Sequence, residues 1–414
     1  MFSKWRWILM QLLQKLWLRA ALFGVLAVLI ALLAVPIERF IENPLPFTIS
    51  ADAVADILDI LASSMLAVTT FSLGVMVTAL GSASSGATPR ANQLVRKDAT
   101  SHNVLATFLG SFIYSLVGII ALHMDVYGET GLIILFATTI AIITLIVVTI
   151  LRWIEHLSIL GRLSETTKRV EVATQKALSE WAAHPCLGGK SLQDQQIPAD
   201  AIAVYTDQVG YIQHIDTGAL AHVATQHHAE VAVLQLPGKF VHAGEAIAWL
   251  RHCREPQLFD SIRSAFTIGD ERSFEQDPRF GMCVLAEIAS RALSPAVNDP
   301  GTAIDVLGRS VRVLQHWSAQ PSNKTVIYDN VLVPALALSD LLDDLYLPIA
   351  RDASGLIEVH LRLQKALQAL SAINADCFAD KTARIARQDL AFAETALTLD
   401  SDKQRLRQLA NLNS

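Results

Sequence analysis

The chain has 414 residues, of which 52% are apolar and 17% are charged, and its formal net charge is −6. Soluble domains usually carry about 25% charged residues, and a disordered chain needs low hydrophobicity and high net charge, so disorder is excluded. Four cysteines exclude a disulfide scaffold, and the negative charge argues against nucleic acid as a partner.

Four charge-free apolar runs lie in the first 151 residues. A helix needs about 20 apolar residues to cross a bilayer. The runs therefore predict a transmembrane domain over residues 1–152, with helices at about 18–37, 53–80, 103–124 and 130–152. Buried core helices of a soluble protein are the alternative, but four in so short a stretch favour the membrane. The first run has no small-x-small site of a cleaved signal peptide.

The loops between these predicted spans alternate in charge. Residues 1–19 carry only basic charges, the next loop is mainly acidic, the loop at 90–98 is mainly basic, and basic residues follow the fourth span. Cytoplasmic loops carry an excess of Lys and Arg. We therefore expect a multi-pass membrane protein with both termini in the cytoplasm.

The remaining sequence predicts a cytosolic α+β region in three parts. Residues 153–192 form a helical neck and linker, in which an amphipathic helix over 152–183 continues the fourth span without a break and a polar linker covers 188–198. Residues 193–255 form a small β barrel- or sandwich-like domain, and residues 256–414 form a helical C-terminal domain. The fold class is thus an α-helical membrane protein with four transmembrane helices and a cytosolic α+β region.

The predicted elements of the two cytosolic domains follow from their hydrophobic periods. The β-rich domain has strands at 201–204, 210–215, 230–236, 239–241 and 245–250 and a helix at 217–227. The run around Pro237-Gly238-Lys239-Phe240 resembles half of a biotinyl/lipoyl-type fold without its carrier lysine, so no covalent cofactor is expected. The last domain has helices at 278–293, 300–318, 335–350, 354–375, 378–398 and 402–411 and a strand at 325–332.

Two stretches carry a resemblance to a known family. One is Gly81-Ser-Ala-Ser-Ser-Gly-Ala-Thr-Pro-Arg90, similar to an ASSQ-x-SPR loop, and the other is Gln276-Asp-Pro-Arg-Phe-Gly281 followed by Glu287-Ile-Ala-Ser-Arg-Ala-Leu-Ser-Pro-Ala-Val-Asn-Asp-Pro-Gly-Thr-Ala303. Together they resemble the DUF2254 family of predicted bacterial membrane proteins over nearly the whole chain. Gly86 replaces a usual Gln, and Glu287 a usual Asp. The resemblance implies an inner-membrane architecture, and the family has no assigned function.

Small and polar residues recur at steps of three or four along the second predicted span and form one helix face. The members of this stripe are Ser63, Ala67, Thr70, Gly74 and Thr78. Such a face permits close helix packing, and it is equally typical of a water-facing pore wall. At the outer end of this helix, Asp52, Asp56 and Asp59 share a face, where they either complement the helix dipole or form an acidic mouth for cations.

The loop from Gly81 to Arg90 is expected in the cytosol, either as a flexible hairpin or as an inner gate with Ser82, Ser84, Ser85 and Arg90. A second cytosolic candidate is the corner between two predicted helices, where Asp299 is the expected N-cap and Pro300 the first helical residue. The corner is either structural or a ligand or subunit contact, with the residues Asp277, Arg291, Asn298, Asp299 and Thr302.

No pattern predicts catalysis or a metal site. Six of the twelve histidines lie between residues 214 and 252, but their spacing matches no zinc pattern, and no serine has a nucleophile-elbow setting. We therefore expect no enzyme, no cofactor and no metal. The preferred interpretation is a homo-oligomeric ion channel or passive transport protein with a cytosolic regulatory domain, in contact with the lipid bilayer and a small ion or ligand. The alternative is a membrane-anchored sensor or scaffold that binds a ligand or protein.

Overall fold

The computed structural model describes residues 4, 8–9, 12, 15–38, 49–192, 201–253, 255, 257–320 and 325–410. Among these, it describes the side chains of all residues except 16, 31–38, 83–85 and 257. The contacts between Cα atoms divide the chain into two units, one of residues 8–166 and the other of residues 167–414 with 1–7. We call them the membrane unit and the C-terminal unit. Residues 193–198 of the predicted linker lie outside the described residues.

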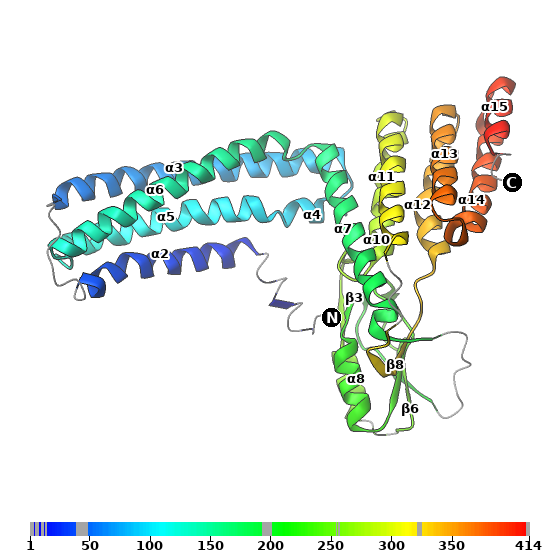
Figure 1. Ribbon diagram of the computed structural model, residues 1–414, viewed down its shortest axis with the longest axis horizontal. Coiled ribbons are helices and arrows are strands. Elements are labelled where there is room, and N and C mark those ends of the chain that lie inside the picture. The colour runs from blue at the N-terminus through cyan, green and yellow to red at the C-terminus, as the bar shows by residue number, and fades with distance from the viewer. Residues whose placement is uncertain are drawn as a thin grey trace. The chain divides into compact units, whose positions relative to one another are not determined.

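The membrane unit is built from helices alone in its described part (Figure 1). These are α2 (Leu16–Glu38), α3 (Ala51–Gly86), α4 (Asn92–Arg96), α5 (Ala99–His123) and α6 (Glu129–Ile159). Three described stretches are long and apolar enough to cross a membrane, namely Ala51–Ser82, Asn92–His123 and Glu129–Ile159, and α2 holds a shorter apolar stretch, Trp17–Ile30. Three of the four predicted spans are thus found as candidates, and the first stays a prediction.

Helix α5 is the inner helix of this bundle, since it contacts α2, α3 and α6. Small residues on α5 let these neighbours approach closely. A Cβ atom added to Gly110 would lie 3.2 Å from Cβ of Phe23 on α2, and one added to Gly118 would lie 3.0 Å from a methyl group of Leu58 on α3. The buried Tyr114 hydroxyl completes the packing with hydrogen bonds to α6. Close packing inside the chain therefore uses small residues of α5.

Two predicted boundaries in this part of the chain are wrong. The loop predicted from Gly81 begins later, because α3 continues to Gly86; single Gly and Ser residues cost a helix only about 0.5–1 kcal/mol each, and a long helix propagates cooperatively. The unbroken helix predicted over 152–183 is interrupted. Helix α6 ends at Ile159, and Gly161 has a left-handed φ of +83° and packs on the backbone of Ala79.

The strands of the C-terminal unit form two sheets. Strands β1 (Gly189–Ser191), β8 (Tyr328–Val333), β4 (Glu230–Val233), β6 (Ala246–Arg251) and β2 (Ile202–Tyr205) form a mixed sheet in that order, and β5 (Phe240–Val241), β3 (Gly210–Ile215) and β7 (Phe266–Gly269) form an antiparallel one. The first sheet takes in β8, which overlaps the strand predicted at 325–332 in the otherwise helical C-terminal domain, and β8 lies parallel to β1 and β4. The barrel- or sandwich-like shape is not confirmed, and the four-part division of the chain stays a prediction.

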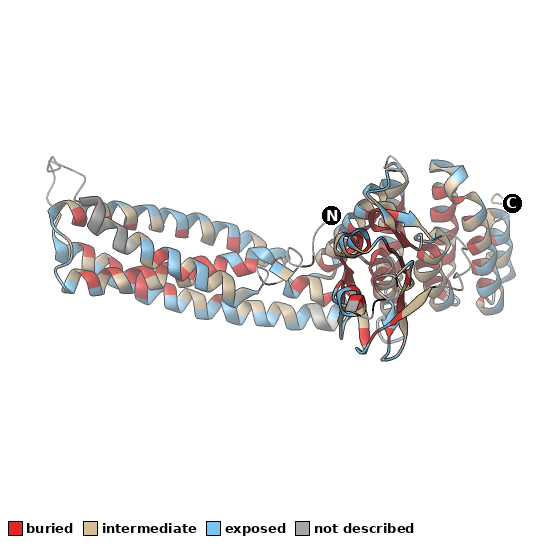
Figure 2. Cartoon of the chain, turned by 90° about the horizontal axis from the view of Figure 1, so that it is seen from below, coloured by how far each residue is buried: buried red, intermediate tan, exposed pale blue. Residues whose placement is uncertain are grey.

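Helices complete the C-terminal unit. They are α7 (Leu163–Ala183), which begins in the membrane unit, and α8 (Thr217–Gln226), α9 (Gln257–Ser264), α10 (Pro278–Leu293), α11 (Pro300–Ser318), α12 (Leu338–Ala353), α13 (Ile357–Ile373), α14 (Ala375–Ala396) and α15 (Asp400–Ala410). Helix α10 packs on α11 and α12, and α13 packs on α11 and α14. Figure 2 shows their buried residues in red on the inward faces. The sequence patterns missed β1, α9 and β7, which are all short.

Candidate functional site: a charged pocket at the start of α10

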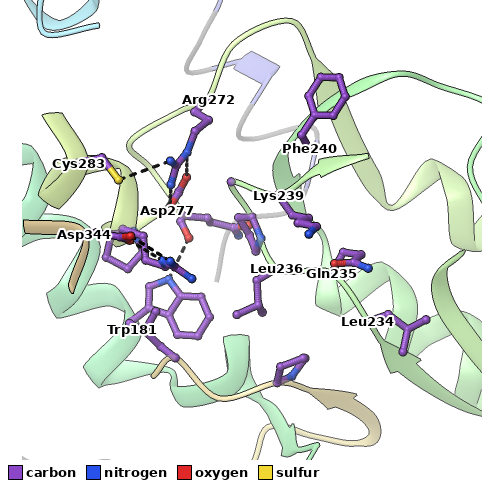
Figure 3. A pocket seen from close by; sticks show the side chains of 17 residues that line it. Trp181, Leu234, Gln235, Leu236, Lys239, Phe240, Arg272, Asp277, Cys283 and Asp344 are labelled. Carbon is purple, nitrogen blue, oxygen red and sulfur yellow. Dashed lines mark hydrogen bonds and ion pairs between the residues drawn. The ribbon is translucent and has the colours of Figure 1, made fainter. Parts of the chain in front are cut away.

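A cavity of about 460 Å³ opens in the C-terminal unit where the chain enters α10 (Figure 3). Four separate segments line it: Trp181 of α7, the loop 234–240 after β4, the stretch around Arg272 and Gln276–Cys283, and the segment around Pro334, Leu336 and Asp344. In Figure 3, Lys239 and Gln235 lie on one wall, and Arg272, Asp277, Cys283 and Asp344 lie on the other. The cavity has the size of an ordinary small-molecule site.

Two sequence motifs meet at this pocket. The turn at Pro237-Gly238 packs directly on Asp277, so closely that a Cβ atom on Gly238 would lie 2.0 Å from Oδ2 of Asp277. Gly238 also has φ +91°, a backbone conformation that favours glycine. The Pro-Gly-Lys-Phe turn and the Gln-Asp-Pro-Arg-Phe-Gly motif are therefore parts of one structure, although 39 residues separate Gly238 from Asp277 (277 − 238).

Asp277 is the N-cap of α10 and lies at the centre of this structure. Its carboxylate accepts hydrogen bonds from the Phe280 amide at 3.0 Å and from Nε and a terminal nitrogen of Arg272 at 2.7 and 3.0 Å. Its side chain is 2% exposed. Burial raises the pKa of Asp277, and the Arg272 guanidinium and the Phe280 amide oppose that rise. Arg272 also lies 5.0 Å above the Phe280 ring, so cation–π attraction adds to the ion pair.

Arg279, two residues further along, ties α10 to α12. Its guanidinium donates to both carboxylate oxygens of Asp344 at 2.7 and 3.1 Å and to Asp340 at 2.6 Å. These bonds to Asp344 raise the pKa of Arg279, so the guanidinium remains charged. Its side chain is still 40% exposed, and Arg279 therefore presents positive charge to the pocket as well as to α12.

Hydrogen bonds to the backbone fix the floor of the pocket. Trp181 donates from its indole nitrogen to the carbonyl of Gln276 at 2.9 Å. The side-chain amide of Gln276 in turn pairs with both backbone groups of Ile215, accepting from its nitrogen at 2.9 Å and donating to its carbonyl at 3.4 Å. Gln276 thus pairs with the end of β3 as a neighbouring strand would, and it holds the entry to α10 against the sheet.

The other wall carries one cation that is not paired. Lys239 is exposed, and no hydrogen bond or ion pair of its ammonium group is found among the described residues, whereas the amide of Gln235 donates to Glu245 at 3.3 Å. Cys283 lies 3.8 Å from a terminal nitrogen of Arg272, and burial raises the pKa of its thiol. The pocket thus combines paired charges with an available ammonium group.

The residues of the predicted cytosolic corner lie at two places, because Asp277 is far from the other four. Asp277 and Arg291 stand near opposite ends of α10, and 14 positions (291 − 277) at 1.5 Å each separate them by about 21 Å. At the second end, Asp299 caps α11 as predicted and accepts from the Thr302 amide and hydroxyl at 3.1 and 2.6 Å, which lowers the pKa of Asp299. Asn298 is exposed with φ +51°. The helix cap that the structural interpretation predicts is thus present, and a ligand or subunit contact at this corner stays a prediction.

The predicted membrane sites are exposed within the single chain. Ser63, Ala67, Thr70, Gly74 and Thr78 all lie on the outer surface of α3. The three hydroxyl groups donate to carbonyl groups of their own helix, and nothing lies within 4 Å of a Cβ atom added to Gly74. Asp52, Asp56 and Asp59 are exposed at the start of α3.

The predicted inner loop is only partly described. Ser82, at the end of α3, and Arg90, in the following turn, are both exposed. The side chains of Ser84 and Ser85 lie outside the described residues, although their backbone belongs to α3. The gate suggested for these four residues therefore stays a prediction.

A buried ionisable pair in the membrane unit escaped the sequence analysis. Asp98 caps α5, accepts from the Ser101 amide at 2.8 Å, and lies 2.8 Å from Nε2 of His156 on α6; their side chains are 9% and 11% exposed. His102 lines a neighbouring cavity of about 140 Å³ with Asp98. The Asp-x-x-Ser pattern could have predicted the helix cap at Asp98. The pairing with His156 could not be predicted from a local pattern, because 58 positions separate the two residues. Among the described residues, no cluster of three or more potential ligands could hold a metal.

These features define a membrane protein with apolar helices and a large α+β unit. The chain belongs to the family described as "Predicted membrane protein (DUF2254)", which matches residues 14–369. It is similar to the uncharacterized protein Mb1321c of Mycobacterium bovis and to the uncharacterized protein Rv1290c of Mycobacterium tuberculosis, with 26% identity over 61% of this chain and 50% of each relative. The chain thus spans about half the length of these curated relatives. No solved structure matches it.

Proposed function

We propose that the protein is a homo-oligomeric channel or passive transport protein of the bacterial inner membrane, with cytoplasmic termini and a regulatory C-terminal unit. The outer face of α3 carries this proposal. Its small and hydroxyl-bearing residues are exposed in the single chain, and their hydroxyl groups donate only to carbonyl groups of α3 itself. A groove of about 590 Å³ runs along Thr70, Gly74 and Thr78 beside Phe71 and Leu157. Copies of α3 around an axis would cover this face or line a path with it.

A comparison with α6 supports the same proposal. The exposed surface of α6 consists largely of big aliphatic side chains, which suit lipid tails: Leu145, Val147, Val148, Leu151 and Ile154. Membrane helices associate through small residues, because these let two backbones approach. The small-residue face of α3 therefore favours a protein neighbour or water, and the exposed Asp52, Asp56 and Asp59 would attract cations to its outer end.

The test measures oligomeric state and flux on the full chain. We expect the protein purified in nanodiscs to be an oligomer by native mass spectrometry and to conduct ions in planar bilayers. Replacing Ser63, Thr70 and Thr78 by Leu should abolish conductance. Thr144→Leu is the matched control, because this exposed hydroxyl on α6 also donates only to its own helix. A monomer, or an oligomer silent at both voltage signs and across pH, would overturn the proposal.

A second function, a membrane-anchored ligand sensor, is favoured by the pocket at the start of α10. Residues of both sequence motifs line this cavity together with Lys239, which has no ion pair among the residues that the structure describes. The conductance and oligomeric state of the protein, which test the channel, do not test this second function. Binding measurements on the C-terminal unit of the intact chain therefore test it separately.

A further inference from the structure

We propose that the pocket at the start of α10 binds a small organic anion through a carboxylate or phosphate group, with Lys239 and Arg279 as its cationic contacts. This inference rests on the sensor function and is independent of the channel. It follows from the charges, the free donors and the shape of the cavity.

The charged side chains that line the cavity sum to a positive value. Three are cations, Lys239, Arg272 and Arg279, and two are carboxylates, Asp277 and Asp344. Arg272 neutralises Asp277 within the wall, and Arg279 binds both oxygens of Asp344. Asp340, the further carboxylate near Arg279, does not line the cavity. The lining therefore keeps the charge of Lys239 uncompensated.

Charged side-chain donors in this pocket remain available to a ligand. A guanidinium has five N–H groups, and three groups of Arg279 are used by Asp340 and Asp344. Lys239 adds an ammonium with three donors. The oxygens of Asp344 already accept from Arg279, and the amide of Gln276 is occupied by Ile215. A ligand rich in acceptors thus fits the cavity better than a ligand rich in donors.

The remaining lining indicates that the ligand has an apolar body. Trp181, Leu236, Pro237 and Pro334 contribute apolar surface next to the charged residues. A volume of about 460 Å³ exceeds what a bare phosphate fills and lies within the range of small-molecule sites. The site therefore suits an organic carboxylate or phosphate ester, with its anionic group at Lys239.

The experiment uses the full chain in detergent, with inorganic phosphate and succinate as probes. We expect at least one of them to raise the thermal midpoint in a saturable way, because a ligand that binds only the native state stabilises it. Lys239→Gln should weaken the apparent affinity about tenfold or more, since a charge-assisted hydrogen bond is lost, and Lys239→Arg should retain most of it. Lys365→Gln, an exposed lysine on α13 outside the pocket, should have no effect.

A second measurement locates the bound probe. A Cys253→Ser, Cys377→Ser variant keeps two cysteines, the half-buried Cys283 and the buried Cys186. The bound anion should slow the alkylation of Cys283. Binding of either probe with this dependence on Lys239 supports the inference and assigns the anionic group. An absent saturable shift, or equal affinity in Lys239→Gln, overturns it. Choline serves as a cationic comparison probe; if choline slows alkylation and neither anion does, the anion class is wrong and the sensor function stands.

Discussion

Gly238 lies against the carboxylate of Asp277, and the space between them is too small for a methyl group. A Cβ atom on Gly238 would lie 2.0 Å from Oδ2 and 2.5 Å from Cγ of Asp277. Because Asp277 is held by Arg272 and caps α10, it cannot move aside without loss of an ion pair and a helix cap. This contact joins the β-turn to the helical part of the C-terminal unit.

Gly238→Ala should destabilise the C-terminal unit by about 3 kcal/mol or more, because it adds a steric overlap with a buried carboxylate to the strain of a left-handed residue. Gly244→Ala is the matched control. Gly244 has a similar φ of +83°, but nothing lies within 4 Å of an added Cβ atom, so only the backbone strain of about 1–2 kcal/mol is expected. Thermal unfolding of the full chain in detergent measures both. Equal losses would contradict the contact with Asp277.

Gly281 is a second position where two elements meet without room for a side chain. A Cβ atom there would lie 2.1 Å from Oγ1 of Thr174 on α7. We expect Gly281→Ala to cost about 2–3 kcal/mol through overpacking, and Thr174→Ala in the same chain to recover part of the loss. Gly308→Ala, in open space on α11, should stabilise by about 0.5–1 kcal/mol. The thermal midpoints of these three variants and the wild type test this ranking, and a neutral Gly281→Ala would refute it.

Glu171 joins α7 to α11 through a buried ion-pair network. It is 7% exposed and accepts from Arg309 at 2.7 Å and from Arg312 at 2.7 and 3.1 Å. Burial opposes ionisation, but the hydrogen bonds from Arg312 and Arg309 lower the pKa of Glu171 below its ordinary value. Glu171→Gln should therefore cost about 1–2 kcal/mol, because charge-assisted hydrogen bonds to Arg309 and Arg312 are weakened, whereas Arg309 keeps Asp305 as a partner at 2.6 Å.

The control for Glu171 is Glu180→Gln, an exposed change on the same helix, which should stay within about 0.5 kcal/mol. The lowered pKa adds a test by pH. The stabilisation from Glu171 is present above the unfolded pKa and is lost as the pH falls through the folded pKa. The difference between wild type and Glu171→Gln should therefore shrink in acid, and a difference that grows in acid would disprove this ion pair.

His360 is fully buried between two acceptors. Nδ1 lies 2.7 Å from the Asp389 carboxylate and Nε2 lies 2.9 Å from the Ser354 carbonyl. Burial lowers the pKa of His360, but Asp389 outweighs that effect with help from Ser354 and Glu358, and the net shift is upward. The folded structure therefore favours the protonated imidazolium form of His360, in which both ring nitrogens can donate to their acceptors. Gln364 also donates to Asp389, at 2.8 Å.

Because the folded pKa is raised, the stabilisation from His360 is complete below its unfolded pKa and is lost as the pH rises through the folded value. The free energy of unfolding should fall above about pH 6.5 in the wild type, and His360→Gln should flatten this slope. His316→Gln, at an exposed position on α11, should keep the slope. Unfolding of the full chain at a series of pH values measures it, and an unchanged slope in His360→Gln would rule out this role.

Local patterns determined most elements of this chain. Apolar runs predicted the candidate spans α3, α5 and α6, and the Asp299-Pro300 cap fixed the start of α11. These predictions succeed because helix length, periodicity and capping depend on neighbouring residues. The missed elements are short, and a few residues carry too little periodic signal against the tertiary contacts that stabilise them. The overextended loop at Gly81 failed because helix propagation outweighs a weak local preference.

The pocket, in contrast, was decided by tertiary structure. The sequence marked the Pro237-Gly238 turn and the motif around Asp277 as separate features, and it joined Asp277 to a corner about 21 Å away along α10. Only the sheet pairing and the packing of α10 on α12 bring Lys239, Arg279 and Asp344 to one cavity. Likewise, the sequence placed small residues on one face of α3, but only the bundle leaves that face outside, because α5 supplies the close contacts within the chain.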